Sequence, residues 1–249
     1  MEGLNFCYLV DENLEQIKMM GNSIHSANEV YGKYDCTINV ISLASYGSEA
    51  DKLIRETAKR NSVKIPCEVT NYDKRITMVI PLPTNSSCQP DLEYNAMSKF
   101  FIPYILKCDY LYYIDNDTIF VKDIYNKLTD FDYEKTLLRI WKGHTFTDFR
   151  PSDHVNSGFI YFNCRLWRKR KRVFFDLMKF YFDKQIAINY VDQTGFDWIA
   201  SEKYKDMCIV ENDLLINQRN VFDGVELLHC FGETKHFYWQ QVEKLGYTK

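Results

Sequence analysis

The chain has 249 residues, of which 46% are hydrophobic and 26% are charged, and its formal net charge is −3. This is the composition of an ordinary soluble globular protein, and the length suits one domain that spans residues 1–249. The negative net charge gives no electrostatic reason to expect nucleic acid as a partner.

Several features bear on the compartment. No apolar run approaches the roughly 18 residues that a membrane-spanning helix needs. The N-terminal segment has no basic stretch and reaches Asp11 before a signal sequence could form. The eight cysteines are scattered without a C-x-x-C pair, as buried thiols are. Asn116-Asp117-Thr118 is a glycosylation sequon, but a glycan there would block the acidic site that this segment suggests. We therefore expect a reducing, cytoplasmic location.

Strand-like and helix-like segments alternate in the first 70 or so residues. We expect strands at Leu4–Val10, Cys36–Leu43 and Val63–Val69, and helices at Glu12–Ala27 and Ser48–Asn61. Ser48 is a suitable N-cap for the second helix. Such alternation predicts an α/β fold in which helices flank a mostly parallel central sheet.

The pattern then breaks over 71–91, a proline-rich stretch that we expect to form a loop or flap. A helix is expected at Tyr94–Leu106, and it leads directly into an apolar strand that spans 110–123. A second irregular stretch, 142–155, precedes an apolar strand at Phe159–Asn163.

One run of basic residues, 165–172, opens a further helix. Such runs are usually solvated helix faces. The alternative is a docking patch for an anionic acceptor or for transient contact with a membrane surface.

The most informative segment is 110–123, an apolar and aromatic run interrupted by Asp115 and Asp117. Side chains at i and i+2 of a strand project to the same side, so the two carboxylates can converge on one cation. Hard oxygen ligands at the carboxyl end of a buried strand suit a divalent metal that holds a diphosphate. The pattern therefore indicates a metal-dependent enzyme that uses a nucleotide sugar.

The same acidic pair occurs in proteins of other kinds. A boundary between strand and turn often carries Asp and Asn simply because they suit turns. An EF-hand fails, because its fifth and sixth loop positions need an oxygen ligand and glycine, and the chain has Ile119 and Phe120 there. A phosphatase of the haloacid dehalogenase type is a weaker alternative. Its aspartate pair normally lies near the N-terminus and is followed by Thr or Val where this chain has Ile119.

Four segments, in a consistent order and covering nearly the whole chain, share a pattern with a known family. They are Tyr113-Ile-Asp-Asn-Asp-Thr118, Val155-Asn-Ser-Gly-Phe-Ile-Tyr-Phe-Asn163, Asp192-Gln193-Thr194 and His229-Cys-Phe-Gly232-Glu-Thr-Lys235. Together they resemble glycosyltransferase family 8, the group of glycogenin and the bacterial lipopolysaccharide galactosyltransferases. The resemblance implies the GT-A nucleotide-diphospho-sugar transferase fold. It also implies transfer of a hexose from a UDP-sugar to an acceptor hydroxyl, with retention at the anomeric carbon.

The resemblance also assigns the metal and the diphosphate. It makes His229 the third metal ligand beside Asp115 and Asp117. Mixed carboxylate and imidazole ligands favour Mn²⁺, with Mg²⁺ as the alternative. Gly232 would let the backbone approach the diphosphate, and Lys235 would neutralise its charge.

For the nucleotide, the resemblance points to Asp11 and Asn13 as the residues that hold the uridine. The next residue is Leu14, where the family usually has a tyrosine stacked on the base, so base affinity or identity is expected to differ. Lys99 stands where the family usually has Arg, and we expect it to pair with Asp115 or to reach the donor.

The remaining donor contacts follow from the same resemblance. Asn156 and Gly158 would line the sugar pocket, and Asn116 belongs to the donor-binding residues. Asp192 and Gln193 lie where the family contacts the donor sugar. Thr194 replaces the family's second aspartate, so one hydroxyl contact and the donor preference are expected to differ.

The catalytic residues expected from this resemblance are Gln193, Asp192 and Lys235. We favour front-face attack by the acceptor, with the amide of Gln193 steadying the developing charge and Asp192 as the fallback nucleophile. The acceptor would be a glycan, a lipid-linked glycan or a protein. A non-enzymatic alternative is a nucleotide-sugar binding protein that has lost turnover.

Overall fold

The computed structural model describes residues 3–79, 90–142, 155–183, 191–211, 216–217, 225–230 and 235–247. Within them, a large sheet has the strand order β3-β2-β1-β4-β7-β6-β8, and a small sheet has the order β5-β10-β9. The strands of the large sheet are β1 Leu4–Val10, β2 Cys36–Ser42, β3 Cys67–Asn71, β4 Tyr110–Ile114, β6 Leu138–Lys142, β7 Val155–Asn163 and β8 Cys208–Glu211. Those of the small sheet are β5 Thr118–Phe120, β9 Ile216–Asn217 and β10 Leu227–His229.

The large sheet is mostly parallel. Strands β3, β2, β1 and β4 run in the same direction, β7 is antiparallel to both β4 and β6, and β8 is parallel to β6. The α/β class predicted from the alternating pattern is therefore confirmed. The strand expected at Val63–Val69 is displaced, because the edge strand of the sheet is Cys67–Asn71.

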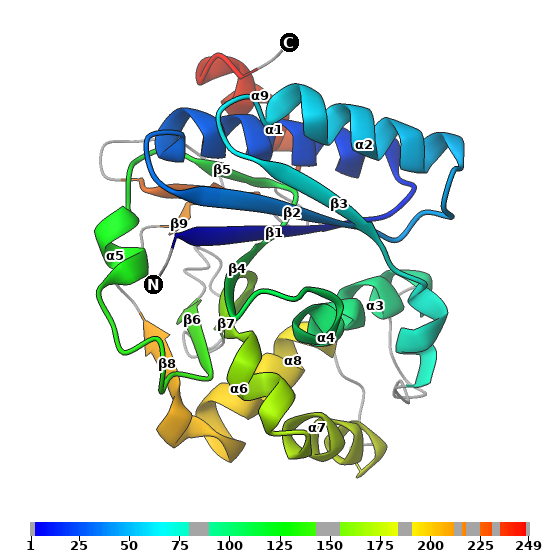
Figure 1. Ribbon diagram of the computed structural model, residues 1–249, viewed down its shortest axis with the longest axis vertical. Coiled ribbons are helices and arrows are strands. Elements are labelled where there is room, and N and C mark those ends of the chain that lie inside the picture. Colours follow the sequence, from blue (N-terminus) through cyan, green and yellow to red (C-terminus); the bar gives the residue numbers. More distant parts are fainter. Residues whose placement is uncertain are drawn as a thin grey trace.

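Two helices cover one face of this sheet, where they lie side by side in Figure 1. They are α1, Leu14–Tyr31, and α2, Glu49–Asn61. Asn13 caps α1 and Ser48 caps α2, because each side-chain oxygen accepts backbone N–H groups of the first turn. Their buried apolar side chains, including Ile24 and Ile54, pack against residues of β1 and β2.

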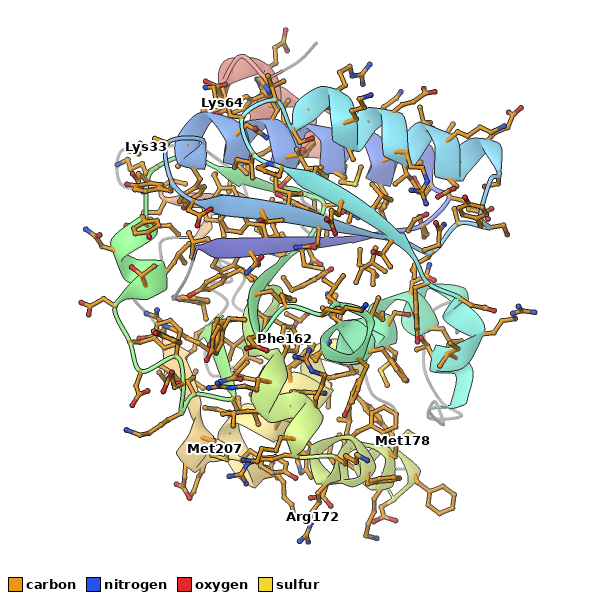
Figure 2. The ribbon with its side chains drawn as sticks, viewed as in Figure 1. Lys33, Lys64, Phe162, Arg172, Met178 and Met207 are labelled. Carbon is orange, nitrogen blue, oxygen red and sulfur yellow. The ribbon has the colours of Figure 1, made fainter. Side chains whose placement is uncertain are left out.

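The other face is covered by the helices drawn in the lower half of Figure 1. Phe162 of β7, labelled in Figure 2, packs here against Trp167 and Phe196, with ring centroids 5.5 and 5.7 Å apart. With α1 and α2 on the opposite face, these helices give the fold three layers. The helices of this second face are α3 Pro90–Met97, α4 Ile102–Ile105, α6 Cys164–Lys169, α7 Arg172–Asp183 and α8 Val191–Asp197.

The remaining described elements connect or flank these layers. Helix α9 packs against the small sheet, where Tyr238 and Val242 join Ile119 and Leu228 in one apolar cluster. Among the described residues, no helix is long and apolar enough to cross a lipid bilayer. The elements are α5 Tyr125–Thr129, α9 Lys235–Lys244, the 3₁₀ segments η1 Lys74–Val79, η2 Ser98–Phe101 and η4 Lys205–Met207, and the π-helical η3 Trp198–Lys203.

Several predicted segments differ in detail from the structure. The helix expected at Tyr94–Leu106 is divided into α3, η2 and α4. The helix expected from 165 onward is two helices, which meet at residues 170 and 171. Of the two irregular stretches, 80–89 and 143–154 lie outside the described residues.

The segment 110–123 also differs from its prediction, since it does not form one strand. Strand β4 ends at Ile114 in the large sheet, and β5 begins at Thr118 in the small sheet. Asp115 and Asp117 lie in the connection between them. The expectation that strand alternation aligns the two carboxylates was therefore wrong; the passage of the chain from one sheet to the other brings them together.

The strand order also defines where a ligand can bind. From β1 the chain moves outward to β2 and then β3, and it returns to place β4 on the other side of β1. Such a reversal leaves a crevice beyond the carboxyl ends of the two central strands. Asp11 follows β1 and Asp115 follows β4, so both stand at this crevice.

Candidate active site

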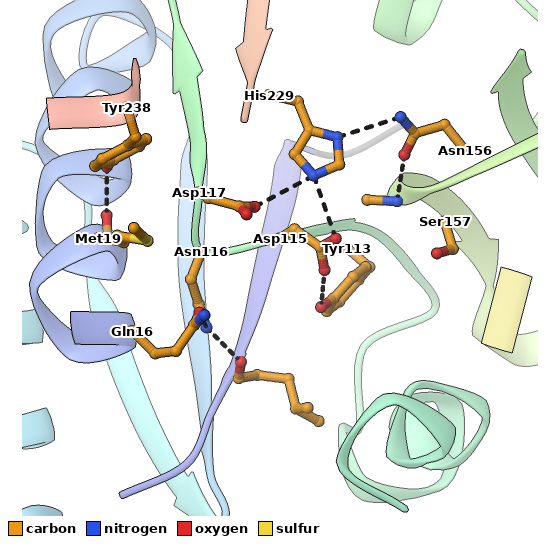
Figure 3. Close-up of polar contacts among 12 residues, drawn as sticks. Gln16, Met19, Tyr113, Asp115, Asn116, Asp117, Asn156, Ser157, His229 and Tyr238 are labelled. Atoms are coloured by element: carbon orange, nitrogen blue, oxygen red, sulfur yellow. Dashed lines mark hydrogen bonds and ion pairs between the residues drawn. The ribbon is translucent and has the colours of Figure 1, made fainter. Parts of the chain in front are cut away.

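One strand pairing brings His229 to the two aspartates that are predicted as metal ligands. In the antiparallel pair of β5 and β10, His229 lies opposite Thr118 and therefore next to Asp117. Its Nε2 atom is 3.2 Å from Asp117 Oδ1 and 3.4 Å from Asp115 Oδ2, as Figure 3 shows. The three residues each offer a ligand atom within 4.8 Å of the others. The structure thus assembles the carboxylate–carboxylate–imidazole set that the sequence resemblance predicted.

Gly158 makes this approach feasible. The antiparallel pairing of β4 and β7 brings it to Asp115, whose backbone N–H donates to the Gly158 carbonyl at 2.8 Å. A Cβ atom on residue 158 would overlap the imidazole of His229 and lie 2.8 Å from Asp115 Oδ2. The position therefore requires glycine because the side chains of two predicted metal ligands pack directly on its Cα.

Asn156 orients the histidine ring. Its Oδ1 atom accepts the Gly158 backbone N–H at 2.7 Å, and its Nδ2 atom lies 3.2 Å from His229 Nδ1. Figure 3 shows the ring held between this amide and the two aspartates. A contact of this type fixes the orientation of a ligating histidine.

A buried lysine connects the candidate metal site to α8. Lys99 Nζ is 3.1 Å from Asp115 Oδ1 and 2.7 Å from Asp192 Oδ2, and it donates to the Ser157 carbonyl at 3.3 Å. The hydroxyl of Ser157 donates to the same Asp192 oxygen at 2.9 Å. The predicted pairing of Lys99 with Asp115 is confirmed, and Asp192 is drawn into the same network.

These contacts shift the pKa values of the buried groups. Burial alone would lower the pKa of His229, but the charges of Asp117 and Asp115 outweigh it and raise that pKa to about 9. Burial would raise the pKa of Asp115, but the Lys99 ammonium and His229 hold it well below its usual range. Burial would also lower the pKa of Lys99, but the carboxylates of Asp115 and Asp192 outweigh it and hold that pKa above its usual range. Asp115 therefore stays ionised at neutral pH.

A pocket of about 210 Å³ extends from Asp115 and Asp117 to the end of β1. Asp11 lines it, and its carboxylate accepts from the Asn95 side chain and from the Asn13 backbone, both at 2.9 Å. Asn13 also lines the pocket while its side chain caps α1. The two residues expected at the uridine therefore do lie in one pocket with the two aspartates.

Asn116 lines the same pocket between these two ends. Its Nδ2 atom donates to the Leu9 carbonyl at 2.9 Å and to Gln16 Oε1 at 3.2 Å. Its Oδ1 atom is buried and has no hydrogen-bond partner within the described part of the chain. An acceptor in that state suits a ligand that brings its own donor, such as a ribose hydroxyl.

The contacts of three predicted site residues with the Asp115–Asp117–His229 group are not established. Gln193 follows Asp192 on α8 and is half-buried. Lys235 is the first residue of α9, but its side chain is not among the described atoms, and Gly232 lies outside the described residues. Their predicted roles at the diphosphate and the sugar therefore stay predictions.

Sequence reasoning missed other members of the site. Tyr113 donates its hydroxyl to Asp115 Oδ1 at 2.5 Å, and Lys99 Nζ lies 4.9 Å from the centre of its ring. Its position two residues before Asp115, on the same apolar run, was a usable signal. Asn95 had none, because its partner Asp11 comes from a segment distant in sequence. Ser157 lies within the quoted segment Val155–Asn163, but its contact with Asp192 could not be read from that segment.

Comparison with known proteins was made by sequence and by structure. No family model matches the sequence, and no curated protein matches it. Solved structures do match the fold. The galactosyltransferase LgtC, crystallised with donor and acceptor sugar analogues, aligns with a TM-score of 0.68 at 13% identity, over 98% of this chain and 100% of its own.

Two further glycosyltransferases have similar folds. Mouse xyloside xylosyltransferase 1 aligns with a TM-score of 0.62 at 14% identity, over 93% of this chain and 99% of its own. GlyE from Streptococcus pneumoniae aligns with a TM-score of 0.62 at 13% identity, over 97% of this chain and 60% of its own. The chain therefore has the GT-A fold of glycosyltransferases, as the sequence resemblance predicted.

Proposed function

We propose that the protein is a metal-dependent retaining glycosyltransferase that moves a hexose from a UDP-sugar to an acceptor hydroxyl. One observation carries the proposal: Asp115, Asp117 and His229 converge at the crevice between β1 and β4. A pocket leads from this acidic site to Asp11 and Asn13, the two residues expected at the uridine. The GT-A fold supports the same function.

The residues present fit a divalent metal. Two carboxylates and one imidazole, with a net negative charge and an open pocket beside them, favour Mn²⁺, and Mg²⁺ is the alternative. When bound, such an ion supplies Lewis-acid stabilisation of the departing diphosphate. Asp115, Asp117 and His229 would hold it, and Lys235 would add a positive charge to the diphosphate site.

The surrounding residues favour front-face attack over a covalent intermediate. The carboxylate of Asp192 is engaged by both Lys99 and Ser157, which reduces its readiness to act as a nucleophile. We assign it instead to positioning of the donor sugar. The amide of Gln193 would steady the developing charge, and the leaving phosphate would take the proton of the acceptor hydroxyl.

The acceptor would be a glycan, a lipid-linked glycan or a protein, and part of the basic run would bring the enzyme to an anionic surface. Arg168 is used internally, since it donates to the carbonyls of Pro103, Leu106 and Cys108. The exposed cations that follow it, from 169 to 172, carry the proposed docking. On α7, which begins at Arg172, the aromatic side chains of Phe175 and Phe182 are exposed as well.

Release of UDP tests the proposal. The protein is incubated with UDP-sugars in Mn²⁺, and free UDP is measured with and without chelator. Metal-dependent release supports the transferase, whereas tight binding without release would identify a nucleotide-sugar binding protein. The phosphatase alternative predicts phosphate release from simple esters with no nucleotide present.

A further inference from the structure

A second pocket adjoins the first along the same edge of the sheet. It has a volume of about 690 Å³, and its lining residues lie at or after the ends of three parallel strands. Leu43 lines both pockets, and Glu12 of the second directly follows Asp11 of the first, so the two pockets are neighbours. The lining residues are Glu12 after β1, Leu43, Ala44, Ser45 and Tyr46 after β2, and Asn71, Tyr72, Asp73 and Arg75 from the end of β3 onward.

Tyr46 has the most exposed aromatic ring of the second pocket. It is 83% exposed, which is unusual for a large aromatic residue. The guanidinium carbon of Arg55 lies 5.6 Å from the centre of its ring. Arg55 is itself anchored, because it donates to the Asp51 carboxylate at 3.1 Å, to the Val69 carbonyl at 3.3 Å and to the Asn71 side chain.

A buried carboxylate organises the loop that carries this tyrosine. Asp51 accepts from the Ser42 hydroxyl at 3.2 Å, the Gly47 backbone N–H at 3.0 Å and the Asn71 side chain at 2.9 Å. It thereby ties the ends of β2 and β3 to the turn at Gly47, whose φ is 76°. Tyr46 thus exposes its ring to solvent, and the guanidinium group of Arg55 that packs against this ring is fixed by hydrogen bonds within the protein.

Position 14 offers no such ring beside the first pocket. Leu14 is 60% exposed at the start of α1, next to Asn13 of the first pocket. An aliphatic side chain there cannot provide an aromatic stacking surface. Arg75, whose side chain is 81% exposed and paired with Asp73, adds a planar cation to the second pocket.

We propose that the second pocket binds the nucleobase of the donor, which stacks on Tyr46 while the diphosphate occupies the first pocket near Asp115 and Asp117. The ligand class is a planar nitrogen heterocycle attached to a ribose diphosphate. This inference rests on the proposed function, since it needs a nucleotide in the first pocket. Stacking of a base on an aromatic side chain changes affinity by about 5- to 150-fold when the ring is removed.

Calorimetry on Mn²⁺-loaded protein tests the inference with two probes, UDP and inorganic pyrophosphate. Tyr46→Ala is expected to weaken UDP binding by about tenfold or more and to leave pyrophosphate binding unchanged. Tyr46→Phe is expected to bind both as wild type does. Tyr104→Ala, which removes another partly exposed tyrosine on α4, is the matched control and should change neither.

The outcomes distinguish failure of this inference from failure of the proposed function. Unchanged UDP affinity in Tyr46→Ala, or equal loss of UDP and pyrophosphate, would overturn the assignment of the base to Tyr46. Wild-type protein that binds pyrophosphate but not UDP would overturn it as well. Wild-type protein that binds neither would refute the proposed function itself, and this inference with it.

Discussion

Lys99 Nζ lies 2.7 Å from Asp192 Oδ2, and the same nitrogen lies 3.1 Å from Asp115 Oδ1. One buried ammonium therefore joins the candidate metal site, at the end of β4, to the residue expected at the donor sugar, on α8. The three side chains come from segments that are distant in sequence, and each is mostly removed from solvent. These ion pairs fix the position of α8 relative to the end of β4.

Removal of this ammonium leaves two carboxylates without their buried partner. For Lys99→Met we expect the free energy of unfolding, measured in urea without metal, to fall by about 3–5 kcal/mol. Lys135→Met is the control, because its ion pair with Asp132 is exposed and should contribute little. Equal effects of the two substitutions would show that Lys99 is not the buried counter-ion described above. Lys99→Arg, which keeps the charge, should recover part of the loss.

Asp117→Asn keeps the shape of a metal ligand and removes its charge. We expect Mn²⁺ affinity to fall and metal-dependent UDP release to drop by about 100- to 1000-fold, because charge stabilisation of the diphosphate is weakened. Far-UV circular dichroism should be unchanged. Asp132→Asn, at an exposed carboxylate of the surface, should behave as wild type in both assays. UDP release by Asp117→Asn at the wild-type rate would contradict the assignment.

Gly158→Ala introduces a Cβ atom against the His229 ring and the Asp115 carboxylate. We expect a loss of stability and of Mn²⁺ binding. A double-mutant cycle with His229→Ala identifies the cause, because removal of the imidazole opens the space that the new methyl group needs. The cost of Gly158→Ala should be smaller in the His229→Ala background. An identical cost in both backgrounds would mean that the glycine serves another purpose.

The exposed face of α7 is expected to bind anionic membranes. Phe175 is 66% exposed and Phe182 is 71% exposed, and they lie about two helical turns apart on the helix that the cations open. Arg172 projects outward from the start of α7 in Figure 2. Co-sedimentation with phosphatidylserine vesicles, but not with phosphatidylcholine vesicles, should fall in Phe175→Ser/Phe182→Ser and in high salt.

The matched control for that experiment is Leu53→Ser/Val63→Ser. These two apolar residues are also exposed but are distant from α7 in sequence, and the basic residues near them are interspersed with the exposed Glu49 and Glu56. Equal binding of both double variants would exclude the α7 face as the docking surface. Binding that does not depend on vesicle charge would show that the basic residues do not drive the docking.

Much of the fold was predictable where one sheet buries a continuous apolar run. Leu4–Val10 is such a run, and its predicted bounds are those of β1. The edge strand β3 was displaced, since Cys67–Asn71 is only half-buried and carries polar residues. Val63, which was predicted to begin that strand, is 81% exposed. Local patterns are weak signals at the edge of a sheet, because burial there is incomplete.

The sequence predicted which residues form the candidate site, but not the strand pairing that brings them together. The run Asp115-Asn116-Asp117 suits a turn after Ile114, and the structure has a turn there. The sequence does not indicate that the chain enters a second sheet, because that change depends on pairing with β10 about a hundred residues later. The same pairing delivers His229 to Asp117, which the sequence alone could suggest only by resemblance. Asn95 and Ser157 entered the site through tertiary contacts that leave no local pattern.

The central claim is that one divalent ion is held by Asp115, Asp117 and His229. Anomalous diffraction at the manganese edge, from crystals grown with Mn²⁺ and UDP, tests it most directly. We predict one strong peak within ligand distance of both carboxylates and of His229 Nε2. A peak elsewhere, or His229 turned away from the ion, would contradict this claim.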